Sequence, residues 1–411
     1  MRAVGEGKLS NGSRAFERHI DRCLGCRACE QVCPAGVEYG QLLEAARAEL
    51  FTSETQRGVG YKAVRFALNH IWLQPARLKF VFAVARLVRD IGLAGLLLDS
   101  GIARILSRRF EFGLALLQSS GSKNGRRINS KGKQSHETRR VSASSSNAAP
   151  QTKVCATKNL AATPAMLFTG CVGEGLFSQV NKATARVLKV NGIESSVPDK
   201  QVCCGALHAH AGDLAGARTL ARQNIKAFSD NEELPIVTNA GGCGAMLASY
   251  GHLLSSDETF ANAARNFSER IRDISQQLQL VGTKAGASVP TGLVTYDASC
   301  HLLYGQHAGE APLEMLAGVS KLNFARLEGS ERCCGGAGIY NLLEPELSRK
   351  VLAEKLANIE ASGAQILATG NPGCQMQIGA GAFLAGMNLR ICHPVELLDE
   401  SYARAGMYSR D

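Results

Sequence analysis

The chain of 411 residues has fourteen cysteines, and the spacing of these thiols is its clearest indication of chemistry. Four of them lie within CLGCRACEQVCPAG at the spacing C-x2-C-x2-C-x3-C-P, namely Cys23, Cys26, Cys29 and Cys33, with Pro34 after the last. The opening stretch MRAVGEGKLSNGSRAF lacks the apolar core of a secretory signal peptide, which favours a reducing, cytoplasmic location. Clustered thiols in such a compartment are expected to hold metal rather than to form disulfides.

The spacing C-x2-C-x2-C-x3-C-P is that of the cluster-binding loops of bacterial ferredoxins. Three thiolates two residues apart wrap one corner of a cubane, and the turn at Pro34 carries the fourth thiolate away, normally to a second cluster. Zinc is the alternative, because C-x2-C is also a zinc spacing, but zinc sites usually pair two such knuckles. We therefore predict a [4Fe–4S] cluster bound by Cys23, Cys26, Cys29 and Cys33.

A second cysteine pattern occurs twice in the rest of the chain. Each copy has a single cysteine, a Cys-Cys-Gly triplet 32 or 33 residues later, and a last cysteine 39 or 40 residues after the pair. The eight positions are Cys171, Cys203, Cys204, Cys243, Cys300, Cys333, Cys334 and Cys374. A repeat of about 130 residues indicates two duplicated domains, and we predict all eight thiols as metal ligands. They could instead be small buried apolar side chains, and the metal could be a cluster or zinc.

Secondary-structure patterns place these cysteines at the ends of strands. Four short apolar runs, each typical of a strand, end at a single cysteine: AMLFTGC, PIVTNAGGC, GLVTYDASC and QILATGNPGC. Helical patterns such as DLAGARTLARQNIKAF and PELSRKVLAEKLANIEA lie between them. Strands that alternate with helices predict a parallel α/β sheet in each copy, and such sheets bind ligands beyond the carboxyl ends of their strands.

Residues 60–115 contain no cysteine and are expected to form amphipathic helices, one of them starting near Pro75. The apolar stripe of that helix comprises Leu78, Val81, Phe82, Ala85 and Val88. Basic residues frame the stripe at Arg77, Lys79, Arg86 and Arg89. We favour a helix packed on a neighbouring domain, and a helix lying on a membrane surface is the alternative. No apolar run reaches the length of about 18 residues that a membrane-spanning helix needs.

The formal net charge of +10 is concentrated in one stretch. Residues 121–140 carry seven Lys or Arg against one acid, and the remainder of the chain is only mildly basic. Nucleic acid is therefore not expected as a partner. Residues 119–163 are rich in Ser, Asn, Gly and Lys and lack periodicity, so they are predicted to be a disordered linker, with Cys155 as a bystander.

Taken together, these motifs resemble the iron–sulfur subunit of glycolate oxidase (glycolate dehydrogenase), a family related to lactate-utilisation and heterodisulfide reductase B-type cysteine-rich proteins. The resemblance lies in HIDRCLGCRACEQVCPAGVEYGQLL, QVCCGALHAHAGD, GGCGAMLASYG, ERCCGGAGIYNLLEPELS and NPGCQMQI, and it covers nearly the whole chain except 119–163. It implies an electron-transfer subunit that receives electrons from FAD-containing glycolate oxidase subunits and passes them toward a quinone. It also implies peripheral association with the inner face of the membrane.

The isolated chain is not expected to oxidise the substrate itself, and no catalytic residue is assigned. No GxGxxG motif follows a strand pattern, and GGAGIY at Gly335 to Tyr340 is expected to be a turn. Two other functions stay open: a zinc-binding or assembly module without redox activity, and a thiol–disulfide reductase that uses the Cys-Cys-Gly triplets. Nearby histidines could be ligands or proton relays, although hydrogen bonding is favoured for His208 and His301, with His210 left open.

The chain departs from the family pattern in two respects. The family has two ferredoxin motifs and this chain has one, and its opening MRAVGEGKL resembles the stretch that comes after the first motif, so a start within a longer gene is expected. A second [4Fe–4S] cluster would then exist only in a full-length member, and Cys33 would lose its own cluster or serve as a fourth ligand. Ala240 and Asn371 also replace a cysteine of the complete repeat, so the non-cubane cluster of heterodisulfide reductases is not expected.

The expected architecture is α+β and α/β: an N-terminal α-helical ferredoxin-like segment followed by two tandem α/β cysteine-rich modules with parallel sheets. The expected domains are a partial ferredoxin-like domain at 1–58, a helical connector at 59–118, the basic linker at 119–163, module 1 at 164–285 and module 2 at 286–411.

Overall fold

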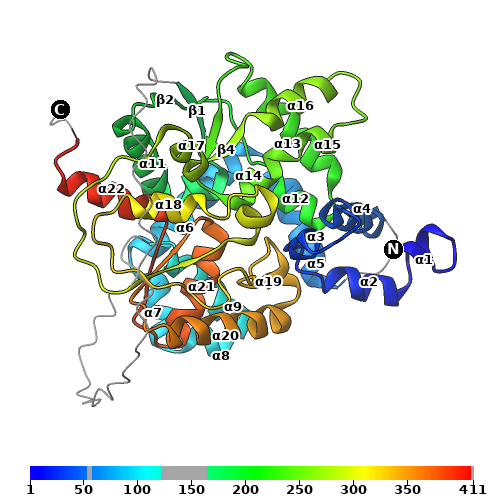
Figure 1. Ribbon diagram of the computed structural model, residues 1–411. Coiled ribbons are helices and arrows are strands. Elements are labelled where there is room, and N and C mark those ends of the chain that lie inside the picture. The colour runs from blue at the N-terminus through cyan, green and yellow to red at the C-terminus, as the bar shows by residue number, and fades with distance from the viewer. Residues whose placement is uncertain (53–57, 122–163, 409–411) are drawn as a thin grey trace.

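The computed structural model describes residues 1–52, 58–121 and 164–408 (Figure 1). The predicted linker, including Cys155, lies outside these residues except for 119–121. The first described part is helical, as expected for the ferredoxin-like segment and the connector. Its elements are α1 (Arg2–Gly5), α2 (Arg14–Asp21), α3 (Ala28–Gln31), α4 (Tyr39–Thr52), α5 (Val59–Ala67), the π-helical η1 (Leu68–Trp72), α6 (Pro75–Asp90), α7 (Leu93–Asp99), α8 (Ile102–Leu106) and α9 (Arg108–Ser119).

Module 1 is built on a four-stranded parallel sheet in the order β2-β1-β3-β4. Its elements are β1 (Ala165–Phe168), α10 (Cys171–Leu176), α11 (Ser178–Val190), β2 (Ser195–Ser196), α12 (Ala206–Ala211), α13 (Leu214–Ala227), β3 (Ile236–Thr238), α14 (Gly241–Ala248), α15 (Tyr250–Leu253), α16 (Ala261–Glu269), β4 (Ile271–Asp273) and α17 (Ile274–Val281). The strands β1 and β3 are fully buried, which is why their sequences are continuously apolar rather than alternating.

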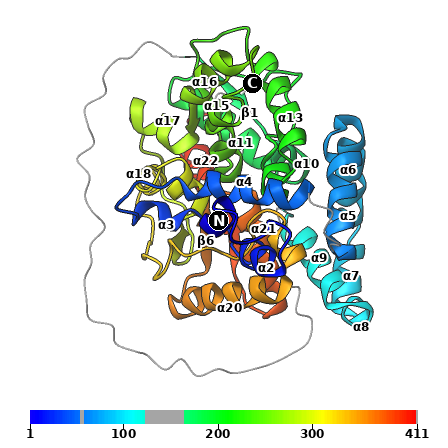
Figure 2. The same cartoon turned by 90° about the vertical axis from the view of Figure 1, so that its right-hand side faces the viewer.

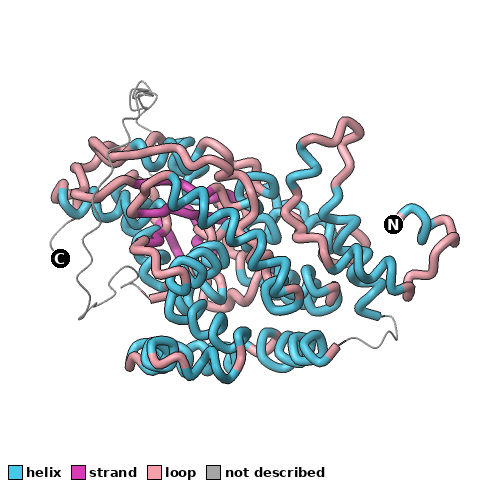
Figure 3. Tube along the Cα trace, turned by 90° about the horizontal axis from the view of Figure 1, so that it is seen from below, coloured by secondary structure: helices cyan, strands magenta, loops and turns pink. Residues whose placement is uncertain are grey.

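Module 2 contains a three-stranded parallel sheet in the order β5-β6-β7. Its elements are β5 (Val294–Asp297), the π-helical η2 (His301–Gly305), α18 (Ala311–Ala317), α19 (Tyr340–Leu343), α20 (Pro345–Ala361), β6 (Ile366–Thr369), α21 (Pro372–Leu384), β7 (Arg390–Cys392) and α22 (Pro394–Arg404). Helices surround the strands of both sheets (Figure 3). The predicted α/β fold class with parallel sheets is therefore confirmed.

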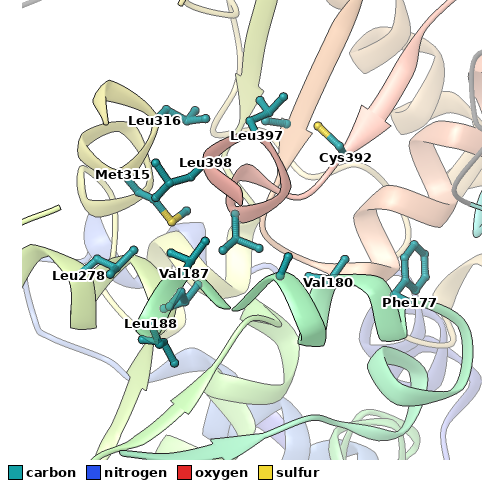
Figure 4. Packing of buried hydrophobic residues seen from close by; sticks show 14 of the residues in the cluster. Phe177, Val180, Val187, Leu188, Leu278, Met315, Leu316, Cys392, Leu397 and Leu398 are labelled. Atoms are coloured by element: carbon teal, nitrogen blue, oxygen red, sulfur yellow. The ribbon is translucent and has the colours of Figure 1, made fainter. Parts of the chain in front are cut away.

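One apolar core joins the two modules. Helix α11 of module 1 packs against α22 of module 2, and α17 packs against α18. Val187 and Leu188 of α11 lie close to Leu398 of α22 and Met315 of α18 in this core (Figure 4). Cys392 of β7 belongs to the same core, so this thiol is a packing residue rather than part of the cysteine pattern.

Helices α5 to α9 form a layer along one side of the molecule (Figure 2). Helix α6 begins at Pro75, as predicted, because proline fits the first turn, where its missing N–H costs nothing. Leu78 and Phe82 of the predicted stripe are buried against module 1, but Val81 is exposed, so its inclusion in the buried stripe was wrong. The reason is geometric: α6 contacts α10 along a narrow strip where the Phe82 ring lies over Gly175.

Candidate functional site

The N-terminal motif places Cys23 and Cys26 in the loop between α2 and α3, Cys29 within α3, and Cys33 in the segment that leads from α3 to α4. Gly25 and Arg27 both adopt left-handed backbone conformations, which curl the chain around the thiols. The Gly25 amide donates to the Cys23 sulfur at 3.4 Å. Burial raises the pKa of Cys26, and it also raises the pKa of Cys29, which is less deeply buried. The neighbouring thiols raise both pKa values further. These three thiols are thus electrostatic neighbours.

Cys33 has a different environment from the other three thiols of the motif. Its sulfur faces the backbone amides of Val37, Ala35 and Gly36, and these donors lower its pKa. A ring of amides stabilises a thiolate without any metal. The expectation that Cys23, Cys26 and Cys29 act together while Cys33 stands apart remains a prediction, and this environment is consistent with it.

The Cys-Cys-Gly triplets are turns that need their glycine. Gly205 has φ of +89° and Gly335 has φ of +82°, a region that residues with a side chain rarely adopt. A Cβ on Gly335 would lie 2.6 Å from the Ser348 carbonyl oxygen, and one on Gly205 would lie 3.3 Å from Ala217 Cα. The glycine therefore lets the chain turn directly after two adjacent thiols while a helix packs against the turn.

The outer cysteines lie where a parallel strand passes into a helix. Cys171 opens α10, Cys243 and Cys374 lie in the first turns of α14 and α21, and Cys300 is the residue before η2. Each helix start leaves unpaired backbone amides, which are possible hydrogen-bond donors near these four positions. The predicted placement of the cysteines beyond the carboxyl ends of the strands is confirmed.

Within each module the four thiols are neighbours. In module 1 the Cys171 and Cys203 sulfurs are 3.5 Å apart, and Cys204 is hydrogen-bonded to both Cys203 and Cys243. The hydrogen bond to Cys203, together with burial, raises the pKa of Cys171 well above its usual value. The fold thus gathers all four cysteines of the first copy.

In module 2 the Cys334 and Cys374 sulfurs are 3.3 Å apart. The pKa of Cys333 is lowered well below its usual value, because the thiols of Cys300 and Cys334 hydrogen-bond to it. Those same hydrogen bonds, with burial, raise the pKa values of Cys300 and Cys334. Cys333 is therefore more easily deprotonated than Cys300 or Cys334.

The N-terminal motif packs directly on the thiols of module 2. Cys26 contacts the apolar cluster that includes Cys300 and Cys333, and each of these three thiols is close enough to influence another's pKa. Two hydrogen bonds fix this contact: the Tyr340 hydroxyl donates to the Arg22 carbonyl oxygen at 3.1 Å, and His301 Nε2 lies 3.2 Å from the Gly25 oxygen. Sequence patterns gave no indication of this contact.

A second contact connects the thiols of module 2 with those of module 1. The side-chain oxygen of Asn371 accepts from the Gly242 amide at 3.2 Å, next to Cys243. Its side-chain nitrogen lies 3.5 Å from the Cys374 sulfur. The Gly241 amide also donates to the Gly370 oxygen at 2.9 Å. Asn371, which stands where the complete repeat has a cysteine, therefore bridges the two thiol groups.

The histidines are hydrogen-bonded, as favoured from the sequence for two of them. His208 is buried, with Nδ1 2.7 Å from Asp213 Oδ2. Burial lowers the pKa of His301 to about 4, so it is neutral at pH 7, and it stacks on His210 with ring centroids 5.2 Å apart.

Polar side chains that the sequence analysis did not identify hold the triplets in place. In module 1, Asn224 donates to the Cys203 carbonyl oxygen and Tyr250 donates to that of Cys204. In module 2, buried Lys355 forms an ion pair with Asp297 at 2.7 Å and donates to the Gly329 carbonyl oxygen, just before Cys333. These residues come close to the thiols only in the folded protein, because each of these three hydrogen bonds joins residues that are 21 to 46 positions apart in the sequence.

The donor set fits a thiolate-bound metal cluster. Among the described residues, no three His, Cys, Asp or Glu side chains converge on a point where one metal ion could be held. The thiols of each module are nevertheless joined pairwise, with Cys171 and Cys203 3.5 Å apart in module 1 and Cys334 and Cys374 3.3 Å apart in module 2. Thiolates are the ligands of iron–sulfur clusters, whose irons are spread over several positions.

Comparison with known proteins agrees with this geometry. Residues 165–248 and 294–379 match the family model of the CCG cysteine-rich domain, one match in each module. The probable glycolate oxidase iron–sulfur subunit of Bacillus subtilis (strain 168) is 33% identical over 406 residues, which cover 98% of this chain and 86% of that protein. This chain belongs to the family of glycolate oxidase iron–sulfur subunits. The resemblance drawn from the motifs is thereby confirmed.

Members of a related group match over a shorter stretch than the glycolate oxidase subunit. Lactate utilization protein A of Oceanobacillus iheyensis is 32% identical over 57% of this chain and 95% of its own length. The protein of the same name from Geobacillus thermodenitrificans is 31% identical over 57% of this chain and 97% of its own length. The relationship to lactate-utilisation proteins expected from the sequence is thus also present.

Proposed function

We propose that this chain is the electron-transfer subunit of a complex that oxidises glycolate or a similar 2-hydroxy acid. In this proposal, FAD-containing partner subunits oxidise the substrate, and the chain passes the electrons on to a quinone. The 33% identity to a probable glycolate oxidase iron–sulfur subunit supports the complex, and the thiol groups support the electron-transfer role. The 2-hydroxy acid itself is oxidised on the partner.

The observation that carries this proposal is the series of contacts between three thiol groups. Cys26 of the N-terminal motif packs against Cys300 and Cys333 of module 2. Asn371 then bridges Cys374 of module 2 to the Gly242 amide beside the thiols of module 1. Stepwise transfer of single electrons requires redox centres that lie close to one another, and the three neighbouring thiol groups would provide such a series.

The ligand assignments match the thiol groups. Cys23, Cys26 and Cys29, with Cys33 as a further candidate, would hold a [4Fe–4S] cluster. The eight cysteines of the two modules would hold additional clusters or zinc. When bound, iron–sulfur clusters accept and release single electrons at potentials set by hydrogen bonds, charge and burial. The protein's part is to fix the thiolates, bury them and supply donors such as the Gly25, Gly335 and Asn371 nitrogens.

Association with the inner face of the membrane is part of this proposal. No helix in the described ranges is long and apolar enough to span a bilayer. Helices α6 to α8 instead expose large apolar side chains, with Phe80 70%, Ile105 85% and Leu106 68% exposed. Exposed basic residues accompany them at Arg77, Lys79, Arg104, Arg108 and Arg109. An apolar surface with a basic rim complements an anionic lipid surface.

Vesicle binding tests this surface. The double variant Ile105→Glu/Leu106→Glu should lose at least about fivefold of its co-sedimentation with phosphatidylglycerol-containing vesicles, because two charges would enter the headgroup region. The control is Leu280→Glu on α17, whose side chain is 62% exposed on a different element. Equal loss in the control, or full binding of the double variant, would exclude α8 from membrane contact.

Anaerobic purification with iron, sulfide and zinc counts tests the ligand assignment. Wild-type protein should absorb near 400 nm, and the absorbance should bleach with dithionite and with glycolate plus the flavoprotein subunits. Cys26→Ser should lose the iron of the N-terminal motif, whereas Cys392→Ala, which alters a core thiol outside the pattern, should keep its full iron content. A colourless, zinc-loaded protein would favour the assembly module, and Cys26→Ser with full iron content would contradict the assignment.

A further inference from the structure

A cleft of about 650 Å³ lies between α6 and module 1. Its outer wall comes from the connector helices, with Trp72, Leu78 and Phe82. Its inner wall comes from β1 of the module 1 sheet and from α11, including Leu167 and Ala185. The volume is within the range of about 300 to 1,000 Å³ that is usual for small-molecule sites.

The cleft reaches the thiols of module 1. Cys171 and Cys203, whose sulfurs are 3.5 Å apart, both line it. Cys204 joins Cys203 to Cys243, and Cys243 follows Gly242, whose amide contacts Asn371 of module 2. A molecule in the cleft would therefore lie at the far end of the series that begins at Cys26.

The chemistry of the walls suits a flat, mostly apolar molecule with a few polar atoms. Trp72, Leu78 and Phe82 provide aromatic and aliphatic surface on the outer wall. Polar and charged residues also line the cleft, namely Lys79, Arg86, Thr169, Glu174, Ser178, Asn181, Lys182, Asp199 and Gln201. Gln201 is held by hydrogen bonds to Thr169, Leu167 and Pro198, so this part of the wall is fixed.

The position of the cleft connects it to the apolar surface of the connector. Helix α6 buries Leu78 and Phe82 toward module 1 and exposes Phe80 and Leu87 on its other sides. Figure 2 shows this helix along the side of the molecule. A hydrophobic molecule dissolved in lipid would thus meet the same helix that forms the wall of the cleft.

We propose that this cleft binds the electron acceptor, a quinone, with its ring against Cys171 and Cys203. The inference rests on the proposed function, because it needs electrons that arrive from a 2-hydroxy acid through the flavoprotein. Oxidation of one 2-hydroxy acid to the 2-oxo acid releases two electrons and two protons. One quinone takes up these two electrons, delivered singly, and two protons from water to become the quinol.

Filling the cleft tests the proposal. In the anaerobically purified, iron-loaded protein, Ala185→Phe should place a ring in the cleft and weaken binding of decylubiquinone at least about tenfold. The matched control is Ala215→Phe on α13, where the native side chain is exposed and does not line the cleft.

Trp72 is the single tryptophan of the sequence, so saturable quenching of its emission by the quinone reports on this cleft. Lys182→Glu, an exposed position at the cleft, is a second variant that should not disturb folding.

Two further readouts separate this inference from the proposed function. Photolabelling with an azido-quinone should modify peptides of α6 or of residues 167–203 in wild type and not in Ala185→Phe. Both proteins should keep the same iron content and the same bleaching by glycolate plus flavoprotein, while reoxidation by quinone slows only in Ala185→Phe. Labelling on the flavoprotein subunits, unchanged binding in Ala185→Phe, or reoxidation by a disulfide but not by quinone would overturn the cleft assignment. Failure of wild type to bleach with glycolate would instead overturn the proposed function.

Discussion

At the scale of single residues, the two Cys-Cys-Gly triplets differ in how tightly their glycine is packed. Gly205 and Gly335 both have positive φ, but a Cβ at Gly335 would overlap a backbone carbonyl oxygen at 2.6 Å. The nearest atom at Gly205 would be 3.3 Å away. The glycine of the triplet should therefore tolerate substitution less well in module 2 than in module 1.

Gly335→Ala should destabilise the protein more than Gly205→Ala, because it adds a clash to the backbone strain of about 1–2 kcal/mol. Gly363→Ala is the control for strain alone, since Gly363 also has positive φ but no atom within 4 Å of a Cβ. Urea unfolding of the three variants should rank Gly335→Ala as least stable. Equal losses at all three positions would mean that packing around the triplets does not matter.

Asn371 is the other residue whose role is decided locally. Its side-chain nitrogen lies 3.5 Å from the Cys374 sulfur, and a donor there stabilises the more negative, reduced form of a bound centre. Asn371→Ala should therefore shift the reduction potential of the module 2 centre to a more negative value in an EPR-monitored titration. Asn358→Ala, which removes a half-buried amide on α20 that donates to the Glu328 carbonyl oxygen, should leave that potential unchanged. A shift of similar size in both variants would argue against the hydrogen bond.

At the scale of elements, the junction between β4 and α17 contains a buried carboxyl group. Asp273 caps α17 by accepting from the Ser275 amide and hydroxyl, within a capping box with Gln276. Its second oxygen has no hydrogen-bond partner among the described residues. Burial raises the pKa of Asp273 to about 6, so the folded protein holds this proton more tightly than the unfolded chain does.

The sign of the resulting pH effect comes from linkage. Because the folded pKa is the higher one, the stabilisation is complete below pH 4 and is lost as the pH rises through about 6. The loss amounts to about 3 kcal/mol for a shift of about two units. Asp273→Asn keeps an acceptor but no charge, so its stability relative to wild type should grow between pH 5 and 7, measured by urea unfolding. Asp230→Asn, an exposed control, should show no such trend. A flat difference for Asp273→Asn would contradict the raised pKa.

At the scale of the whole molecule, one apolar core spans both modules, beside further cores within module 1 and within module 2. Val187 and Leu188 of module 1 pack with Met315 and Leu398 of module 2 (Figure 4). The bidentate pair between Arg186 and Asp399 spans the same contact at 2.7 and 2.9 Å. This shared packing keeps the thiol groups of the two modules beside each other.

Leu398→Ala should cost about 2–5 kcal/mol, because it leaves a cavity in a fully buried position. Since the core is shared, both modules should unfold together at a lower urea concentration, as seen by hydrogen exchange of β1 and β5. Leu384→Ala, at a 41% exposed position, should have little effect. Loss of protection in β5 alone would mean that the modules unfold independently.

The sequence by itself determined the local features of this protein. Short apolar runs indicated the strands β1, β3, β5 and β6, and Pro75 marked the start of α6. The repeated cysteine spacing indicated two duplicated modules, and the alternation of strand and helix patterns indicated a parallel sheet in each. These properties depend on neighbours close in the chain, so spacing alone can reveal them.

Only the tertiary structure decided how the thiol groups are arranged relative to one another. The contact of Cys26 with Cys300 joins residues 274 positions apart, and Asn371 reaches Gly242 across 129 positions. The same holds for Val81, which follows the helical period yet faces outward because only a narrow strip of α6 meets module 1. Packing between distant elements depends on shape and on which buried faces meet, and a one-dimensional pattern carries neither.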